Sequence, residues 1–286
     1  MKLVFSRKGF DAATSKVPSP ILPSGQLCSL PIPDRRPERQ KTLRFYKDIQ
    51  TSDLSLGQLV ADLSRGRILP ETPTHLDPDL NAASVPRPSG WRSAFGQSGA
   101  AETHLQRQGV GPGDIFLFYG WFRQAEVGDG RFRYLPNARD WHVLFGWLQV
   151  ERHIPLTAVA DIPPWAVDHP HCQRRQPLNP DSLYIAREKL DLSGIDLPGG
   201  GVFPRFHEGL RLTDPDSQHR SLWRLPAWFH PAGRLSALSY HGRSDRWQWV
   251  DGAVQLDTVG RGQEFVLDTD HYPEASAWLH TLFTDR

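Results

Sequence analysis

Proline and glycine interrupt this sequence along its whole length, and that spacing limits what the chain can fold into. The 286 residues include 25 prolines and 24 glycines, and both residue types disfavour the interior of a helix. Long helices are therefore scarce, and the short apolar runs between the breakers favour strands. We expect one domain over residues 1–286 with an α+β architecture: a strand-rich mixed fold with a central antiparallel, partly barrel-like sheet and a few short helices.

Three segments carry the signals of a helix. Residues 53–65 place leucines and a valine along one apolar stripe and end before Gly66. Residues 98–108 open on small side chains and end before Gly109. Residues 272–283 carry apolar side chains on one face, with a proline at the start. These are the short helices of the expected fold.

Aromatic and apolar runs mark the strands. Residues 114–123 form a continuous apolar and aromatic run that predicts a buried strand, and residues 131–135 and 141–150 follow it as the next two. A glycine-containing turn joins the first pair, so the three form an antiparallel meander. Residues 3–5 predict an earlier buried strand. Further short strands are expected at residues 182–187, 201–206, 222–224, 235–240, 246–250, 253–256 and 262–267.

The charge balance argues against a protein that binds long duplex DNA without sequence preference. Lys and Arg total 33 and Asp and Glu total 32, which leaves a net charge of +1. Proteins that grip a duplex through many phosphate contacts carry a strongly basic surface. The composition remains compatible with a nucleotide-sized partner or with a local basic groove.

Cysteine usage and hydropathy indicate the compartment. Cys28 and Cys172 are the only cysteines, and neither lies in a CxxC pair, so the sequence holds neither a disulfide framework nor a cysteine-based zinc site. A reducing cytoplasm is the location that this usage favours. No apolar run approaches the roughly 18 residues of a membrane-spanning helix, so no membrane partner is expected.

The sharpest local pattern is His75-Leu76-Asp77-Pro78-Asp79. In an extended segment His75, Asp77 and Asp79 project to one side, and His-x-Asp supplies two ligands of the 2-His-1-carboxylate triad. The third ligand would come from a later histidine: His142, His169 or His171. Our candidate metal set is His75, Asp77 and His171, with divalent iron, manganese or zinc as the ion. The alternative is a proline-bounded loop in which both aspartates cap turns.

A second cluster, His169-Pro170-His171, places two imidazoles one residue apart, with Asp161 or Asp168 as a neighbouring carboxylate. Metal ligation, phosphate contact and acid–base chemistry all use such groups. The alternative is a surface loop in which histidine and proline merely form a turn. The candidate catalytic residues are thus His75, Asp77, Asp79, His169 and His171.

Other residues are candidates for holding a substrate. Arg7 follows the first strand and suits a phosphate, with Asp11 to orient it or to act as a base. Gln97 precedes a helix start, where an amide can read a base edge, and Trp121 could stack on a base. Ordinary turns and core packing are the alternatives. The candidate substrate-binding set is Arg7, Asp11, Gln97, Trp121 and His142.

Several further segments accompany His75-Leu76-Asp77-Pro78-Asp79-Leu80 and His169-Pro170-His171: residues 5–11, 18–23, 30–34, 95–97, 113–122, 223–226 and 262–266. In these residues the chain resembles a bacterial and phage family called nucleotide modification associated domain 3. The resemblance spans essentially the whole sequence and implies a setting, the modification of bases in DNA, without a settled reaction or assigned catalytic residues.

Three functions stay open at this point. The first is a nucleotide- or nucleobase-modifying enzyme, with or without the assistance of a metal, whose partner is a nucleotide or a modified base in DNA. The second is a non-catalytic reader of modified bases, similar to PUA-like and EVE-like modules, with Trp121 and Trp141 in an aromatic cage. The third is an interaction protein without a polar pocket. The enzyme requires the segments near positions 7, 75, 97 and 170 to meet in one hollow.

Overall fold

A computed structural model describes residues 1–51, 54–156, 162–174, 178–260, 262 and 264–284. Its main element is a mixed sheet of nine strands. The strands of this sheet are β1 (Lys2–Arg7), β2 (Ser19–Ile21), β5 (Ala94–Ser98), β6 (Ile115–Gly128), β7 (Arg131–Tyr134), β8 (Trp141–Pro155), β9 (Asp181–Ala186), β10 (Gly200–Val202) and β14 (Glu264–Asp268).

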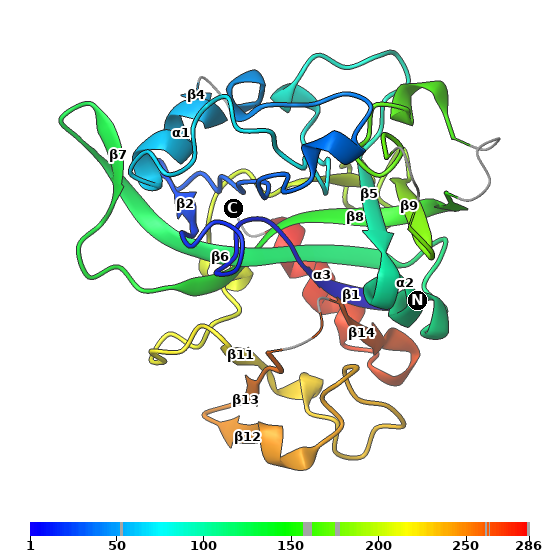
Figure 1. The fold of residues 1–286 in the computed structure, drawn as a ribbon. Coiled ribbons are helices and arrows are strands. Elements are labelled where there is room, and N and C mark those ends of the chain that lie inside the picture. The colour runs from blue at the N-terminus through cyan, green and yellow to red at the C-terminus, as the bar shows by residue number, and fades with distance from the viewer. Residues whose placement is uncertain (52–53, 157–161, 175–177, 261, 263, 285–286) are drawn as a thin grey trace.

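The long path through this sheet runs β14-β1-β6-β8-β9-β5, with β2 and β7 also paired to β6 and β10 paired to β8 (Figure 1). β7 and β8 both run antiparallel to β6, β8 along residues 115–122 and β7 along residues 125–128. The predicted meander is therefore wrong in its order, because β8 pairs with β6 and not with β7. The sheet as a whole is not purely antiparallel, because β1 and β2 both run parallel to β6. A long connection joins β1 to β6, and parallel pairing requires such a crossover. The strand-rich α+β prediction is confirmed.

The expected partial barrel is an open sheet. No backbone ladder joins the edge strands β5 and β14 in the described part of the chain. Only side chains meet across that gap, where the Gln97 amide donates to the Glu264 carboxylate. Lys8 forms an ion pair with the same carboxylate, with 3.1 Å between Nζ and Oε1. A buried polar contact between side chains, and not strand pairing, therefore links the two edges of the open sheet.

Aromatic side chains form much of the core packed against the large sheet. Phe95, Phe116, Phe118 and Tyr184 are fully buried, and the ring centroids of Phe95 lie 5.1, 5.2 and 5.9 Å from those of the other three. Such distances are typical of favourable tilted and stacked aromatic contacts. Most aromatic side chains of β6 and β8 therefore belong to the core and are not available to stack on a base.

All three predicted helices form, with shorter bounds: α1 (Leu56–Leu63), α2 (Gly99–Arg107) and α3 (Ala275–Thr284). Ser55 caps α1 by accepting a hydrogen bond from the Gly57 amide, while the expected first residue, 53, lies outside the described residues. None of the helices in the described ranges is long and apolar enough to cross a bilayer.

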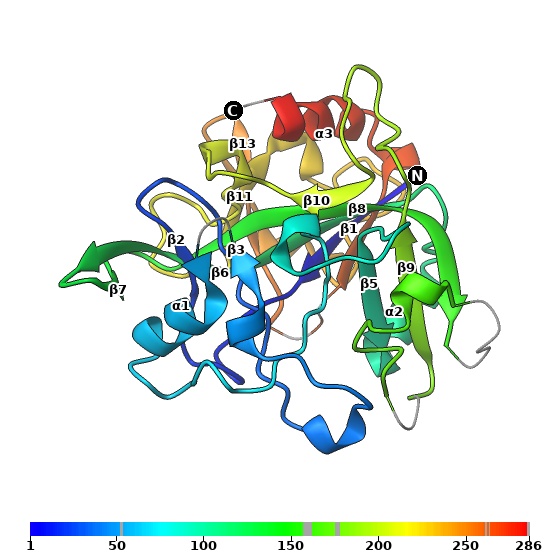
Figure 2. The same cartoon turned by 90° about the horizontal axis from the view of Figure 1, so that it is seen from above.

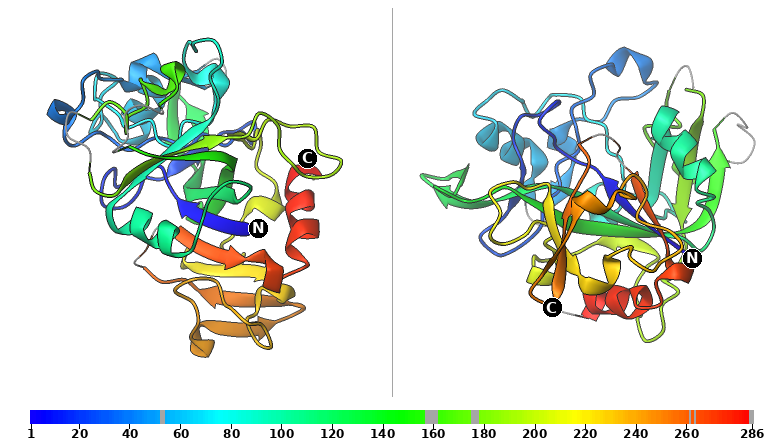
Figure 3. Two further views of the ribbon diagram at one scale, coloured as in Figure 1. Left: turned by 90° about the vertical axis from the view of Figure 1, so that its right-hand side faces the viewer. Right: turned by 90° about the horizontal axis from the view of Figure 1, so that it is seen from below.

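Elements on both faces cover the large sheet (Figures 2 and 3). One face carries α1 and the small pair of β3 (Gln50–Thr51) and β4 (Leu54–Ser55). The other carries α3 and a three-stranded sheet in the order β11-β13-β12. The strands of this small sheet are β11 (Leu222–Pro226), β12 (Trp247–Val250) and β13 (Ala253–Asp257).

Two strand predictions need correction. Residues 235–240 form loop and turn instead of a strand: Tyr240 has a φ of 67°, and the amide of His241 donates to the Leu238 carbonyl, which closes a turn. The strand expected at 201–206 is the shorter β10, since Pro204 has no amide to donate to a ladder.

Cys28 is a core residue, and its reactivity is predictable. Its side chain is 2% exposed, and burial raises the pKa of the thiol to about 12. Because only the thiolate is alkylated, iodoacetamide at pH 8 should modify Cys28 in the native protein more than about 100-fold more slowly than in urea. Mass spectrometry of the peptide reads both rates, and equal rates would contradict the burial.

Candidate metal centre and neighbouring cavities

Loops at one end of the large sheet bring three histidines around Asp77. His75 and Asp77 lie in the connection from α1 to β5, and His169 and His171 lie in the connection from β8 to β9. The first loop is anchored on β5, because the backbones of Asp79 and Ala94 exchange hydrogen bonds of 2.9 and 3.0 Å. Residues almost a hundred positions apart are thereby placed side by side.

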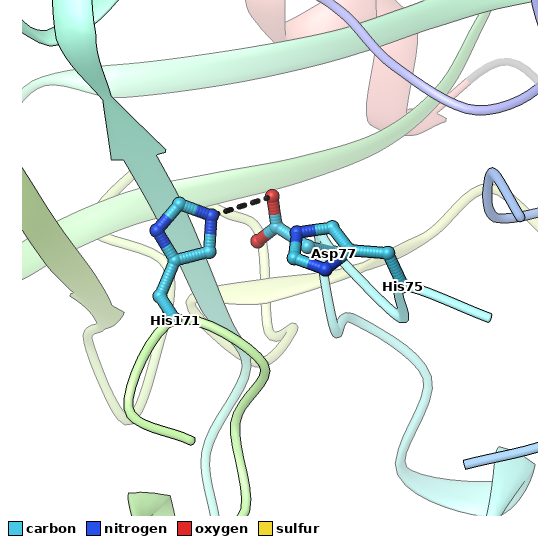
Figure 4. A group of neighbouring side chains, drawn as sticks. All are labelled: His75, Asp77 and His171. Carbon is cyan, nitrogen blue, oxygen red and sulfur yellow. Dashed lines mark ion pairs between the residues drawn. The ribbon is translucent and has the colours of Figure 1, made fainter. Parts of the chain in front are cut away.

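The groups converge closely enough to share one ion. His169 Nε2 lies 3.3 Å from Asp77 Oδ1, and His171 Nε2 lies 3.8 Å from Asp77 Oδ2. The ring centroids of His75 and His171 are 5.4 Å apart. One ligand atom from each of His75, Asp77 and His171 lies within 4.8 Å of the other two, and Figure 4 shows the three side chains facing one another.

Asp181 fixes the orientation of His171. Its Oδ1 lies 2.6 Å from Nδ1 of His171, and Arg174 donates both to the other carboxylate oxygen and to Nε2 of the same ring, the latter over 3.2 Å. This network places the proton of the neutral ring on Nδ1 and leaves Nε2 as an acceptor. A carboxylate behind a histidine in this way is the usual outer partner of a metal-binding imidazole.

Gly96 of β5 makes room for the cluster. Its amide donates a 2.7 Å hydrogen bond to Asp77 Oδ1, which orients the carboxylate. A Cβ at this position would lie 2.2 Å from Cγ of His171, far inside contact distance. The ring of His171 therefore packs against the strand only because residue 96 has no side chain.

The protonation states suit a cation. Burial, reinforced by His171 and opposed by Asp77, lowers the pKa of His75 to about 3. Burial also lowers the pKa of His171, against the hydrogen bond to Asp181. Burial alone would raise the pKa of Asp77, but the imidazoles of His169 and His171 outweigh it and hold that pKa below its ordinary value. At neutral pH the cluster offers two neutral imidazoles and one carboxylate, the forms that bind divalent metals.

A cavity of about 280 Å³ opens beside His75. Arg35, Arg36, Arg39 and Arg174 lie in its lining, against one carboxylate, that of Asp34. Within the described ranges no ion pair uses the guanidinium of Arg36 or Arg39. The approach to His75 is thus strongly cationic although the whole chain is almost neutral.

The structure separates Asp79 from the other catalytic candidates. Arg87 holds it in a bidentate ion pair with two contacts of 2.6 Å, so it balances a charge of its own and does not belong to the group that could hold an ion. The carboxylate beside His171 is Asp181 and not Asp168, which accepts from Gln173. Asp161 lies outside the described residues.

The expected single hollow is instead two cavities. Arg7, Asp11, Trp121 and His142 line one of about 200 Å³, while His75 lines the arginine-rich one. The stretch from residue 11 to 14 runs between them, since Asp11 lines the first and Thr14 the second. Gln97 points into the buried contact with Glu264, so its amide is already engaged.

Three residues of the cluster's surroundings escaped sequence reasoning: Gly96, Arg174 and Asp181. No spacing rule connects them to His75 or His171. The only signal was the composition of the stretch that follows His171, where an arginine and an aspartate accompany the histidine pair.

Comparison with known proteins gives one match. A family model described as nucleotide modification associated domain 3 matches residues 2–268, a range that includes the histidine cluster and both cavities. No curated protein and no solved structure matches the chain.

Proposed function

The chain belongs to the nucleotide modification associated domain 3 family, and from that premise we propose that it is an enzyme that modifies a nucleotide or nucleobase at a divalent metal held by His75, Asp77 and His171. Membership gives the general role, nucleotide modification. The reaction centre is our proposal, and it rests on the geometry of the cluster.

The single observation that carries the proposal is the convergence of three ligand atoms within 4.8 Å, with Asp181 behind one of them. Two imidazoles and one carboxylate leave coordination positions open, which is typical of catalytic rather than structural sites. Iron, manganese or zinc bound there would polarise a substrate oxygen or a water molecule. All three proposed metal ligands lie in loops, which commonly hold the reactive groups of enzymes.

His169 is the acid–base residue of the proposal. Its Nε2 is buried and lies 3.3 Å from Asp77 Oδ1, and its Nδ1 accepts from the His171 amide. An imidazole in this position is placed to take or give a proton beside the metal ligands.

The arginine-lined cavity supports a phosphate-bearing substrate. Guanidinium groups bind phosphate oxygens in a bidentate manner, and four of them line the space next to His75. The net charge of +1 favours a nucleotide or a locally gripped strand over a long duplex. Base modification in DNA is the finer form of this proposal.

Metal content tests the proposal. Protein purified without added metal should contain iron, manganese or zinc at about one ion per chain by elemental analysis, and His75→Ala should lose it. His219→Ala is the matched control, because His219 is an exposed histidine that does not belong to the group that could hold an ion. Wild-type protein that stays metal-free even after incubation with each ion would refute the metal centre.

Asp181→Asn should weaken metal binding without removing a ligand. The amide oxygen still accepts from His171, but the lost negative charge makes that imidazole less basic, so we expect metal affinity to fall by about 10–100-fold. Competition with a chromophoric chelator measures the change. Asp168→Asn, in the same loop but bonded to Gln173, should keep the wild-type affinity, and an unchanged affinity in Asp181→Asn would argue against its role.

A reader of modified bases is the second candidate. Trp121 lines a cavity separate from the one beside His75, as a reader would need. Trp141, however, stacks on Phe206 at 5.4 Å between centroids and under Arg211, so the two tryptophans form no common cage. Quenching of tryptophan fluorescence by a modified nucleoside, in a protein that binds no metal, would favour the reader.

A further inference from the structure

The cavity lined by Arg7, Trp121, His142 and Arg220 is built from distant parts of the chain. Arg7 ends β1 and lies opposite Tyr119 in the parallel pair. Trp121 and His142 are partners in the β6–β8 ladder, so the sheet itself sets three of the four side chains next to one another. Arg220, from the loop before β11, covers the Trp121 ring at 4.6 Å.

Positive charge in this cavity is not balanced by the protein. Within the described residues the guanidinium groups of Arg7 and Arg220 form no ion pair and no hydrogen bond. The one carboxylate of the lining, Asp11, already accepts 2.6 Å hydrogen bonds from the amide and the hydroxyl of Thr14. Lys8 is neutralised by Glu264. Two guanidinium groups therefore remain for an anion.

His142 contributes a neutral donor. Its side chain is 6% exposed, and Trp223 Nε1 donates to its Nδ1 over 2.9 Å. The ring proton is therefore on Nε2, and no described residue accepts it. Burial, together with Arg220 and Arg7, lowers the pKa of His142 to about 3, which keeps the ring neutral at physiological pH. The same shift reflects the unbalanced cations around it.

We infer that this cavity is a second binding site, distinct from the metal cluster, for a phosphate group. Two guanidinium forks and an imidazole N–H offer donors only, which fits the acceptor-only oxygens of a phosphate. Its volume of about 200 Å³ admits such a group. Trp121 of the same lining has a buried indole nitrogen that finds no hydrogen-bond partner in the described part of the chain.

Calorimetric titration with inorganic phosphate tests the site. Wild-type protein should bind phosphate in this cavity, and Arg7→Gln and Arg220→Gln should each weaken that binding by about 10-fold or more, since each removes a charged hydrogen bond. Arg139→Gln is the matched control, because Arg139 is an exposed arginine outside the lining of this cavity that donates to the Pro215 carbonyl. Melting curves confirm that each variant is folded.

Two further arms locate the site and its ligand. Arg36 lines the other cavity, beside His75, so Arg36→Gln can weaken only phosphate bound there. The phosphate that Arg7→Gln loses should still bind to Arg36→Gln and to His75→Ala with the wild-type affinity, which separates this site from the metal centre. Tighter binding of a deoxynucleoside 5′-monophosphate than of phosphate identifies a nucleotide as the source, and equal binding identifies free phosphate. No binding heat with wild-type protein, or a loss with Arg36→Gln but not with Arg7→Gln, would overturn the inference.

Discussion

Asp77→Asn is expected to abolish metal binding while the protein stays folded. Asparagine keeps an oxygen that accepts from the Gly96 amide, a 2.7 Å contact in the native cluster, but it removes the only charge among the three proposed ligands. We expect metal affinity to fall by more than about 100-fold, beyond the usual effect of an outer-sphere change. Stability should change by no more than about 1–2 kcal/mol. Elemental analysis and thermal melting measure the two quantities.

Asp79→Asn is the informative counterpart. Asp79 has the same chemistry two residues away, but its carboxylate is occupied by Arg87. The substitution leaves that guanidinium without its buried partner, so stability should fall while the metal content remains. A variant of Asp77 that retains its metal, or of Asp79 that loses it, would show that the ligand set is assigned wrongly.

Gly96→Ala should have the second large effect. The added methyl would lie 2.2 Å from Cγ of His171, so the imidazole must leave its position beside Asp77. We expect a stability loss of about 1–3 kcal/mol, as for other overpacked sites, and loss of metal binding although no ligand has been replaced. Melting curves and metal content in one preparation test both effects.

Gly111→Ala provides the control. Nothing lies within 4 Å of a Cβ built at Gly111, so this alanine should be close to neutral in stability and in metal content. If Gly96→Ala behaved like Gly111→Ala, the packing of His171 against β5 would not matter for the site.

Local signals explain which parts of the fold were predictable. The aromatic runs at residues 114–123 and 141–150 predict two antiparallel strands that lie side by side, because little chain separates them and much of it is the hairpin strand β7. The parallel pairing of β1 with β6 depends on a connection of more than a hundred residues, about which periodicity says nothing. Local sequence thus predicts which residues form a strand, but it does not predict which strands pair.

The candidate site, too, could be predicted only in part. His75 and Asp77 do meet, but not through the alternation of an extended strand, since the Asp77 amide donates to the His75 carbonyl and closes a tight turn. That turn is why Asp79, placed by alternation on the same side, faces Arg87 instead. Asp181 and Gly96 reach His171 only through the pairing of β9 with β5. The spacing of residues in the sequence does not predict that pairing.

The stretch from Asp11 to Thr14 has a consequence for how two ligands would influence each other. Asp11 and Ala13 line one cavity and Thr14 lines the other, and Arg35 of the second cavity donates a hydrogen bond to the Ala13 carbonyl. If a ligand in one cavity displaced this stretch, it would change the binding free energy of a ligand in the other. Thermodynamic reciprocity requires the factor to be identical in both directions, so the two chambers would titrate as a coupled pair.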